Sequence, residues 1–264
     1  MSLKNIENDV IKVVQSRASL RSYDPKPVSE EHQDAILEGA MRAPTAGNMM
    51  LYSMLVISDQ TLKEKLSETC DHQPFIARAP FVVVFLADFQ RWFDYFEVSG
   101  VKEYCQERNL PYSGPDEADL LLAANDALIA AQNAVIVAES LGIGSCYIGD
   151  IMENYEVHRD LLNLPPWVFP ITMLCFGYYP EKRPALRPRF DGKFIVFENQ
   201  YRRLEKQDFN EMFAGNEEKL NQNNPYKAKN FAQFMYAKKT GSDYSAEMAR
   251  SVREALKHWK GQDL

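Results

Sequence analysis

The fold is set by residues 119–149, which read DLLLAANDALIAAQNAVIVAESLGIGSCYIG. The first part, residues 119–141, is apolar over most of a helical circumference, and such a pattern predicts a long helix inside the core. Gly142 is a typical end for that helix, because glycine readily adopts the left-handed conformation of a helix C-terminus. The rest of the domain is therefore expected to pack around this helix.

The glycines at 142, 144 and 149 allow two interpretations. A dinucleotide-binding fingerprint is disfavoured, because the segment follows a helix instead of a strand and lacks the third glycine. The glycines instead permit close approach of the backbone to a flat ligand and offer peptide N–H groups to it. A plain helix cap and turn explains Gly142 well and Gly149 poorly.

On both sides of this segment the sequence predicts mixed helices and strands without strict alternation, which indicates an α+β fold. Valine- and aromatic-rich runs predict strands at residues 52–57, 81–87, 169–178 and 193–197. Helices are predicted at residues 5–16, from the capping Ser29 to a stop at Pro44, and at 62–69, 155–162 and 208–220. A last helix carries Met248, Val252, Leu256 and Trp259 on one face, which needs a partner surface.

Composition narrows the function. The 264 residues include 37 acidic and 30 basic side chains, a net charge of −7, which argues against a nucleic-acid partner. Apolar runs are shorter than a membrane span and the N-terminus is too polar for a signal peptide, so we expect a cytoplasmic protein. The cysteines (Cys70, Cys105, Cys146, Cys175) and histidines (His32, His72, His158, His258) show no metal-binding spacing, and we expect the cysteines to be buried.

Two arginine clusters are candidates for binding one anion. Residues 17–21 read RASLR and place two guanidinium groups and a hydroxyl within one turn of chain. Residues 183–189 read RPALRPR, where prolines reduce the entropy lost when arginines clamp an anion. A solvated surface turn and a proline-rich surface loop are the alternatives.

Two further segments could form a ligand site. Residues 43–48, APTAGN, leave room for a ring system and supply Thr45 and Asn48 as hydrogen-bonding groups, although a helix-terminating turn explains them equally well. Residues 89–115 are rich in aromatic side chains, and an excursion of this size is often a lid over a site.

Together these segments resemble the FMN-dependent nitroreductase family. RASLR, APTAGN, GIGSCYIGD and GYYPEKRPALRPR occur in the family's order, and the likeness, greatest to its larger NADPH-preferring branch, covers about residues 10–210. The resemblance implies a nitroreductase-like fold, a mostly antiparallel central sheet flanked by helices, in an intertwined homodimer. Residues 1–215 would form the FMN-binding domain, and residues 216–264 a C-terminal arm that packs on the same domain or on the partner.

The resemblance also implies a cofactor site for FMN. The residues that match the family's motifs are Arg17, Ala18, Ser19, Arg21, Thr45, Ala46, Asn48, Gln73, Tyr147, Ile148, Gly149, Arg187 and Arg189. The arginines and Ser19 would hold the phosphate, ribityl and pyrimidine side, and residues 147–149 would contact the reactive edge. Ala46 stands where serine is common and Arg187 where lysine is usual. Asp150 stands where glycine often follows, and we expect its carboxylate to face solvent or an arginine.

The implied activity is hydride transfer from NAD(P)H through FMN to nitroaromatics, quinones or similar acceptors, by a ping-pong mechanism without an obligatory acid–base side chain. Free flavin is an alternative acceptor, and a flavin-binding module without turnover is an alternative from another class. Only Lys227 and Lys229 are available in the tail loop that binds the NADPH 2′-phosphate in relatives.

Overall fold

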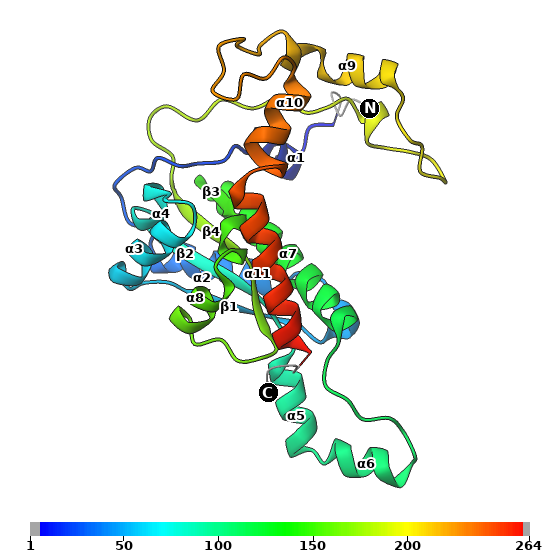
Figure 1. Cartoon of the computed structure of the whole chain (residues 1–264). Coiled ribbons are helices and arrows are strands. Elements are labelled where there is room, and N and C mark those ends of the chain that lie inside the picture. Colours follow the sequence, from blue (N-terminus) through cyan, green and yellow to red (C-terminus); the bar gives the residue numbers. More distant parts are fainter. Residues whose placement is uncertain (1–5, 261–264) are drawn as a thin grey trace. The chain divides into compact units, whose positions relative to one another are not determined.

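The computed structural model describes residues 6–260, which form two compact units (Figure 1). The larger unit consists of Asn8–Ala185 and the chain from Met248 onward. The smaller unit consists of Leu186–Glu247 with the first described residues. The division into an FMN-binding domain at residues 1–215 and a C-terminal arm at residues 216–264 stays a prediction.

The larger unit is built on an antiparallel sheet. Its four strands lie in the order β1-β2-β4-β3, with β1 at Tyr52–Val56, β2 at Phe81–Asp88, β3 at Ile143–Ile148 and β4 at Val168–Tyr178. The α+β class and the predicted strands that correspond to β1, β2 and β4 are confirmed.

Two expectations about strands were wrong. The segment interpreted as a glycine turn is strand β3, in which Cys146 lies opposite Cys175 of β4. Its glycines hid the apolar alternation that marks a strand. Residues 193–197 form no strand, because the 3₁₀-helix η3 (Gly192–Phe194) is followed by Ile195 and Val196, both exposed and without a partner strand among the described residues.

Helices occur in both units. They are α1 (Asp9–Ser16), α2 (Glu30–Met41), α3 (Gln60–Thr69), α4 (Pro74–Ala77), α5 (Gln90–Val98), α6 (Val101–Glu107), α7 (Glu117–Ser140), α8 (Tyr155–Leu161), α9 (Lys206–Glu217), α10 (Phe231–Met235) and α11 (Asp243–Trp259). Short helices are η1 (Ala46–Asn48), η2 (Gly149–Met152) and η4 (Tyr236–Thr240). The predicted start of the first helix at Asn5 lies outside the described residues.

Both faces of the sheet are buried. Alternate residues of β2 point to opposite sides, so Val83 and Phe85 belong to one hydrophobic cluster and Val82 and Val84 to another. The first cluster includes α2, α7 and the end of α11, and the second includes α3 and α4. All four cysteines are buried, as expected, and three of them belong to these clusters.

Helix α7 is the predicted core helix. It begins with a capping box between Asp116 and Asp119, and its inner face of alanines lies against the sheet and α2. Among the described residues it is the one helix long and apolar enough to cross a membrane, and 44% of its most apolar window is buried inside the structure. Its outer face leaves Leu121, Leu122 and Leu128 exposed.

Helix α11 finds its partner surface within its own chain. Ala255 and Trp259 are 3% and 1% exposed in the core, and the Trp259 indole N–H donates to the Asp116 carbonyl at 2.9 Å. The Trp167 indole N–H donates in turn to the Trp259 carbonyl at 2.8 Å. The partner surface predicted for the apolar face of the last helix is thus the core of the larger unit.

Candidate functional site

The RASLR segment lies directly against β3. The Leu20 N–H donates to the Ser145 carbonyl at 2.9 Å, and Ser19 and Ser145 form a parallel bridge. Leu20 is 1% exposed, so the middle of the motif is anchored in the core while Arg21 stays exposed. The RASLR segment and strand β3, which are far apart in the sequence, therefore lie side by side.

The glycines of β3 make this approach possible. A Cβ at Gly144 would lie 2.7 Å from both Leu20 and Tyr179 side-chain atoms, closer than real contacts allow. Gly142 has φ +74°, the left-handed region that favours glycine, and ends the turn after α7. Gly142 thus ends the helix, as predicted, and Gly144 leaves room for the side chains of Leu20 and Tyr179.

A basic pocket opens beside the RASLR segment. It has a volume of about 420 Å³ and is lined by residues 19–22 and by Pro180 and residues 182–185. Arg21, Lys182 and Arg183 supply positive charge, and Ser19 and Ser22 supply hydroxyls. The structure therefore joins the first arginine cluster to the beginning of the second.

Buried polar atoms at this site have no partner within the described chain. The Arg17 Nε and the Ser145 hydroxyl are both buried without a hydrogen bond. Unsatisfied buried donors cost free energy, so native proteins usually pair them with protein, water or ligand. The Arg17 Nε and the basic pocket fit the phosphate of a nucleotide-like cofactor, whereas the Ser145 hydroxyl is completely buried and does not line the pocket.

The electrostatics agree with clustered arginines. Burial raises the pKa of the Cys146 thiol on β3, and nearby Arg21 and Arg17 oppose that rise. Burial also raises the pKa of Glu139 at the end of α7, against the opposing effects of the Tyr179 hydroxyl, Arg17 and Arg183. These side chains lie close enough to influence one another's charge.

Gln73 lies beside the turn that follows β3. It is the N-cap of α4, and its Nε2 donates to the Cys70 carbonyl at 2.9 Å and to Asp150 Oδ2 at 3.0 Å. Asp150 is half-buried, so the expectation that its carboxylate faces solvent or an arginine was wrong. An amide, which also offers an N–H donor, takes the place of the arginine.

Residues 147–149 continue this edge of the sheet. The Tyr147 hydroxyl donates to Gln132 Oε1 at 3.2 Å, and burial raises the tyrosine pKa to about 12. Ile148 is buried, whereas the space beside Gly149 is open where a Cβ would project. The backbone at Gly149 is therefore accessible to a ligand.

The APTAGN loop is held by an acid that the motif analysis missed. Asp126, 2% exposed on α7, accepts from the Ala46 N–H at 3.0 Å and from the Leu51 N–H at 3.1 Å. The Thr45 hydroxyl accepts from the Met50 N–H at 3.2 Å, and Asn48 has φ +58°. An acid within an otherwise apolar helix was the signal available in the sequence.

The aromatic segment at residues 89–115 contains helices α5 and α6. The Trp92 indole N–H donates to the Met49 carbonyl at 2.7 Å, and Arg91 donates to the Met50 carbonyl at 3.0 Å, so α5 contacts the end of the APTAGN loop. The Phe93 ring lies 4.2 Å from the Trp167 ring, centroid to centroid. A lid function for this segment stays a prediction.

The remaining predicted residues are distributed as follows. Ala18, which precedes the bridge at Ser19, is half-buried. Arg187 and Arg189 are exposed and belong to the smaller unit, so their part in the phosphate site stays a prediction.

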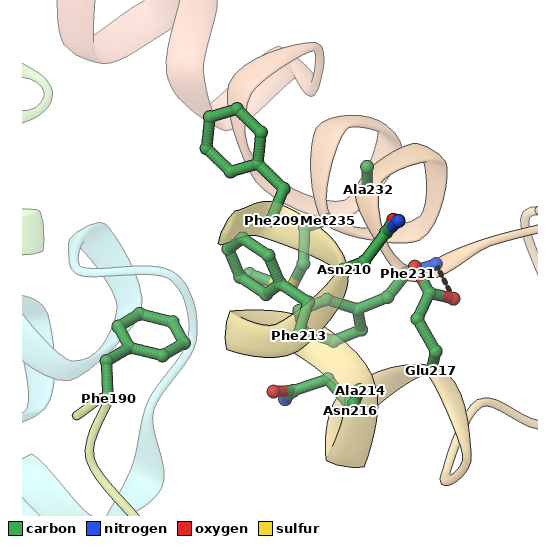
Figure 2. Close-up of a pocket in the computed structure, with 10 residues that line it drawn as sticks. All are labelled: Phe190, Phe209, Asn210, Phe213, Ala214, Asn216, Glu217, Phe231, Ala232 and Met235. Atoms are coloured by element: carbon green, nitrogen blue, oxygen red, sulfur yellow. Dashed lines mark hydrogen bonds between the residues drawn. The ribbon is translucent and has the colours of Figure 1, made fainter. Parts of the chain in front are cut away.

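The smaller unit has an aromatic pocket of its own, with a volume of about 770 Å³ (Figure 2). Phe209 and Phe213 of α9 and Phe231 and Met235 of α10 line it, together with Phe190. The Glu217 carboxylate accepts from the Phe231 N–H at 2.8 Å and so ties the two helices together. The polar groups are few, so this surface suits an apolar partner.

Comparisons with known proteins identify relatives of this chain. The model of the nitroreductase family matches residues 14–178. The FMN reductase [NAD(P)H] of Bacillus subtilis is 32% identical over 194 residues, which are 74% of this chain and 75% of that protein. The oxygen-insensitive NADPH nitroreductase of Salmonella typhimurium is 32% identical over 196 residues, 74% of this chain and 76% of the relative.

A solved structure extends the likeness of fold to the smaller unit. Nitroreductase A from Vibrio parahaemolyticus superposes with a TM-score of 0.77 and covers 95% of this chain and 98% of its own. At 24% sequence identity this comparison shows the fold alone. The matched length includes the C-terminal region, where the sequence likeness was weakest.

Proposed function

This chain belongs to the nitroreductase family, and from that premise we propose that it binds FMN and transfers hydride from NAD(P)H to small electron-poor acceptors such as nitroaromatics and quinones. The predicted family and enzyme class are confirmed: the chain is an NAD(P)H-dependent oxidoreductase of the nitroreductase and flavin reductase type. The identity of the cofactor in this chain and its acceptors are our proposal.

One observation carries the proposal of FMN. The RASLR segment lies on β3 beside a basic pocket, with the unpartnered Arg17 Nε close to the same strand. Arginines bind phosphate oxygens with paired N–H groups, and a buried donor without a partner favours an anion that supplies one. A flavin with a phosphate fits this site better than one without.

The other motif residues suit the ring end of the cofactor. The Gln73 amide and the open backbone at Gly149 lie at the same end of β3, where hydrogen bonds to a flat ring are possible. When bound, FMN supplies the hydride chemistry, so the chain needs to bind, orient and exclude water. We therefore assign no acid–base side chain.

The relatives support the choice of donor and acceptors. Their names include NADPH nitroreductase and FMN reductase [NAD(P)H], so a free flavin is the second candidate acceptor for this chain. Lys227 and Lys229 are the residues available to bind the 2′-phosphate of NADPH. They lie in a loop that Asn224 closes by donating to the Ala228 carbonyl at 3.0 Å. We propose NADPH as the preferred donor on this basis.

We further propose a homodimer. The outer face of α7 exposes Leu121, Leu122, Leu128 and Ile129 on adjacent turns, an apolar strip that water solvates poorly. The aromatic pocket of the smaller unit is a second surface of this kind. Substitution L128D should lower the molar mass measured by light scattering from that of two chains to that of one, and an unchanged mass would refute this interface.

Composition and burial support a proposal for the location and the remaining partners. We propose a cytoplasmic protein without nucleic-acid or membrane partners. The net charge of −7 disfavours polyanions, and α7, the most apolar helix described, packs against the sheet.

The test uses purified protein. We expect yellow protein, or apoprotein that takes up FMN, whose flavin absorbance is bleached by NADPH and restored by a nitroaromatic. Protein that rejects FMN would refute the proposal. Protein that binds FMN but is not reduced by NADPH or NADH would indicate a flavin-binding module without turnover.

A further inference from the structure

Besides the residues that match the family's motifs, we propose that Arg183 is a phosphate-binding residue, held over the basic pocket by a support made of Tyr179 and Glu139. The inference rests on the proposed function, since the phosphate in question is that of FMN. Arg183 would let the protein distinguish FMN from unphosphorylated riboflavin.

The first step is the position of Arg183. It lines the same 420 Å³ pocket as Ser19, Arg21 and Ser22. Two guanidinium groups and two hydroxyls around one cavity can together donate to several oxygens of a phosphate dianion. The RASLR segment alone contributes only part of this set.

The second step is the support beneath it. The Arg183 guanidinium carbon lies 4.1 Å from the centroid of the Tyr179 ring, a stacking distance. The Tyr179 hydroxyl lies 2.8 Å and 2.9 Å from the two carboxylate oxygens of Glu139, which is 7% exposed. The buried carboxylate therefore fixes the ring at its tip, and one face of the ring is free to support the guanidinium of Arg183.

The third step is the space for this ring. A Cβ at position 144 would approach the tip of the Tyr179 ring to 2.7 Å, so the glycine of β3 makes room for the tyrosine. The same glycine admits Leu20 of the RASLR segment. Gly144 thus allows both segments that form the pocket to pack against β3, one through Leu20 and the other through Tyr179.

The support explains why an exposed arginine would act as more than a solvated side chain. A free arginine loses much rotamer entropy when it binds an anion, and stacking on a fixed ring reduces that loss. The buried carboxylate of Glu139 also offsets the repulsion among the arginines around the pocket, since Arg17 and Arg183 both act on it. Glu139 and Tyr179 are positioning residues in this scheme.

A phosphate monoester could come from FMN or from the 2′-phosphate of NADPH. We assign it to FMN because Arg183 shares its pocket with Ser19 and Arg21, whose segment is anchored to β3. If the phosphate is that of FMN, substitution of Arg183 should lower the affinity for FMN. If it is the 2′-phosphate of NADPH, the same substitution should change the preference for NADPH over NADH.

The experiment is titration of apoprotein with FMN and with riboflavin, followed by quenching of flavin fluorescence. We expect R183Q to raise the Kd for FMN on the order of tenfold, the loss of one charge-assisted contact, and to leave the Kd for riboflavin within about twofold. R183K should lie between, because lysine keeps the charge but lacks the planar group. Y179L should resemble R183Q, and Y179F should have a smaller effect.

Arg108 provides a matched control. Its guanidinium carbon also lies 4.1 Å from the centroid of a tyrosine ring, that of Tyr104, outside the basic pocket. R108Q should leave the Kd for FMN unchanged. Circular dichroism and melting temperature identify a variant that fails to fold, and R183Q, at an exposed position, keeps the test available if Y179L does not fold.

The outcomes separate this inference from the proposed function. Wild-type protein that binds neither flavin would refute both. Wild-type protein that binds FMN tightly, with R183Q binding it equally well or losing both flavins alike, would overturn the role of Arg183 alone. A changed ratio of KM for NADPH and NADH with an unchanged Kd for FMN would assign the phosphate to the nicotinamide and also overturn it.

Discussion

Asp126 should contribute several kcal/mol to stability, and D126A tests this. The carboxylate accepts two backbone N–H groups, those of Ala46 and Leu51, at 3.0 Å and 3.1 Å. A hydrogen bond to a charged group contributes roughly 1.5–3 kcal/mol, so the two bonds together contribute about 3–6 kcal/mol before the cost of burying the charge. With that cost, we expect D126A to lower the free energy of unfolding by about 3 kcal/mol.

The assay is urea unfolding of apoprotein at one fixed protein concentration, followed by circular dichroism. D126N keeps one acceptor oxygen and should lose about half as much as D126A. E254Q is the control, because Glu254 forms an exposed i,i+3 pair with Lys257 and should change stability by less than about 0.5 kcal/mol. A loss below about 1 kcal/mol for D126A would show that the APTAGN loop is held by other contacts.

Three further predictions concern the site and its surroundings. G144A should cost roughly 1–3 kcal/mol and lower the melting temperature, because the new methyl group overlaps neighbouring side chains; an unchanged melting temperature would contradict the account of β3. Arg250 lowers the pKa of Glu156 to about 2 from its ordinary 4.5, so the pair should stabilise the protein above about pH 5 and lose that effect as the pH falls toward 2. The stability difference between wild type and R250Q should therefore shrink over this range, and a constant difference would argue against the pair. D150G should raise the midpoint potential of bound FMN by roughly 30 mV, measured by dye equilibration, because a carboxylate disfavours added negative charge nearby; an unchanged or lower potential would place Asp150 too far from the ring.

Strands and helices with a strong apolar signal could be predicted from the sequence. The continuous apolar run of β2 and the leucine- and alanine-rich α7 carry signals that tertiary contacts do not reverse. Strand β3 could not be predicted, because Gly144 serves the approach of Leu20 and not the strand's own propensity. The run at 193–197 shows the converse, since β-branched residues form a strand only where another strand can pair with them.

The candidate site was predictable only in part for the same reason. Short motifs such as RASLR revealed the arginines, but not that Ser19 would pair with Ser145 of β3. Arg183 belongs to a cluster that the sequence suggested. Its proposed role in binding phosphate depends on the ring of Tyr179, which only the fold places against it. Asp126 lies about 80 positions along the chain from the loop it holds, and no local pattern links them.

The most direct measurement of the central claim is the affinity of apoprotein for FMN compared with riboflavin, in wild type and in R21A. Arg21 lines the basic pocket and belongs to the segment anchored on β3. We predict that wild type binds FMN far more tightly than riboflavin and that R21A loses on the order of tenfold in FMN affinity alone. Equal binding of the two flavins by wild type, or unchanged retention of FMN by R21A, would contradict a phosphate site at this pocket.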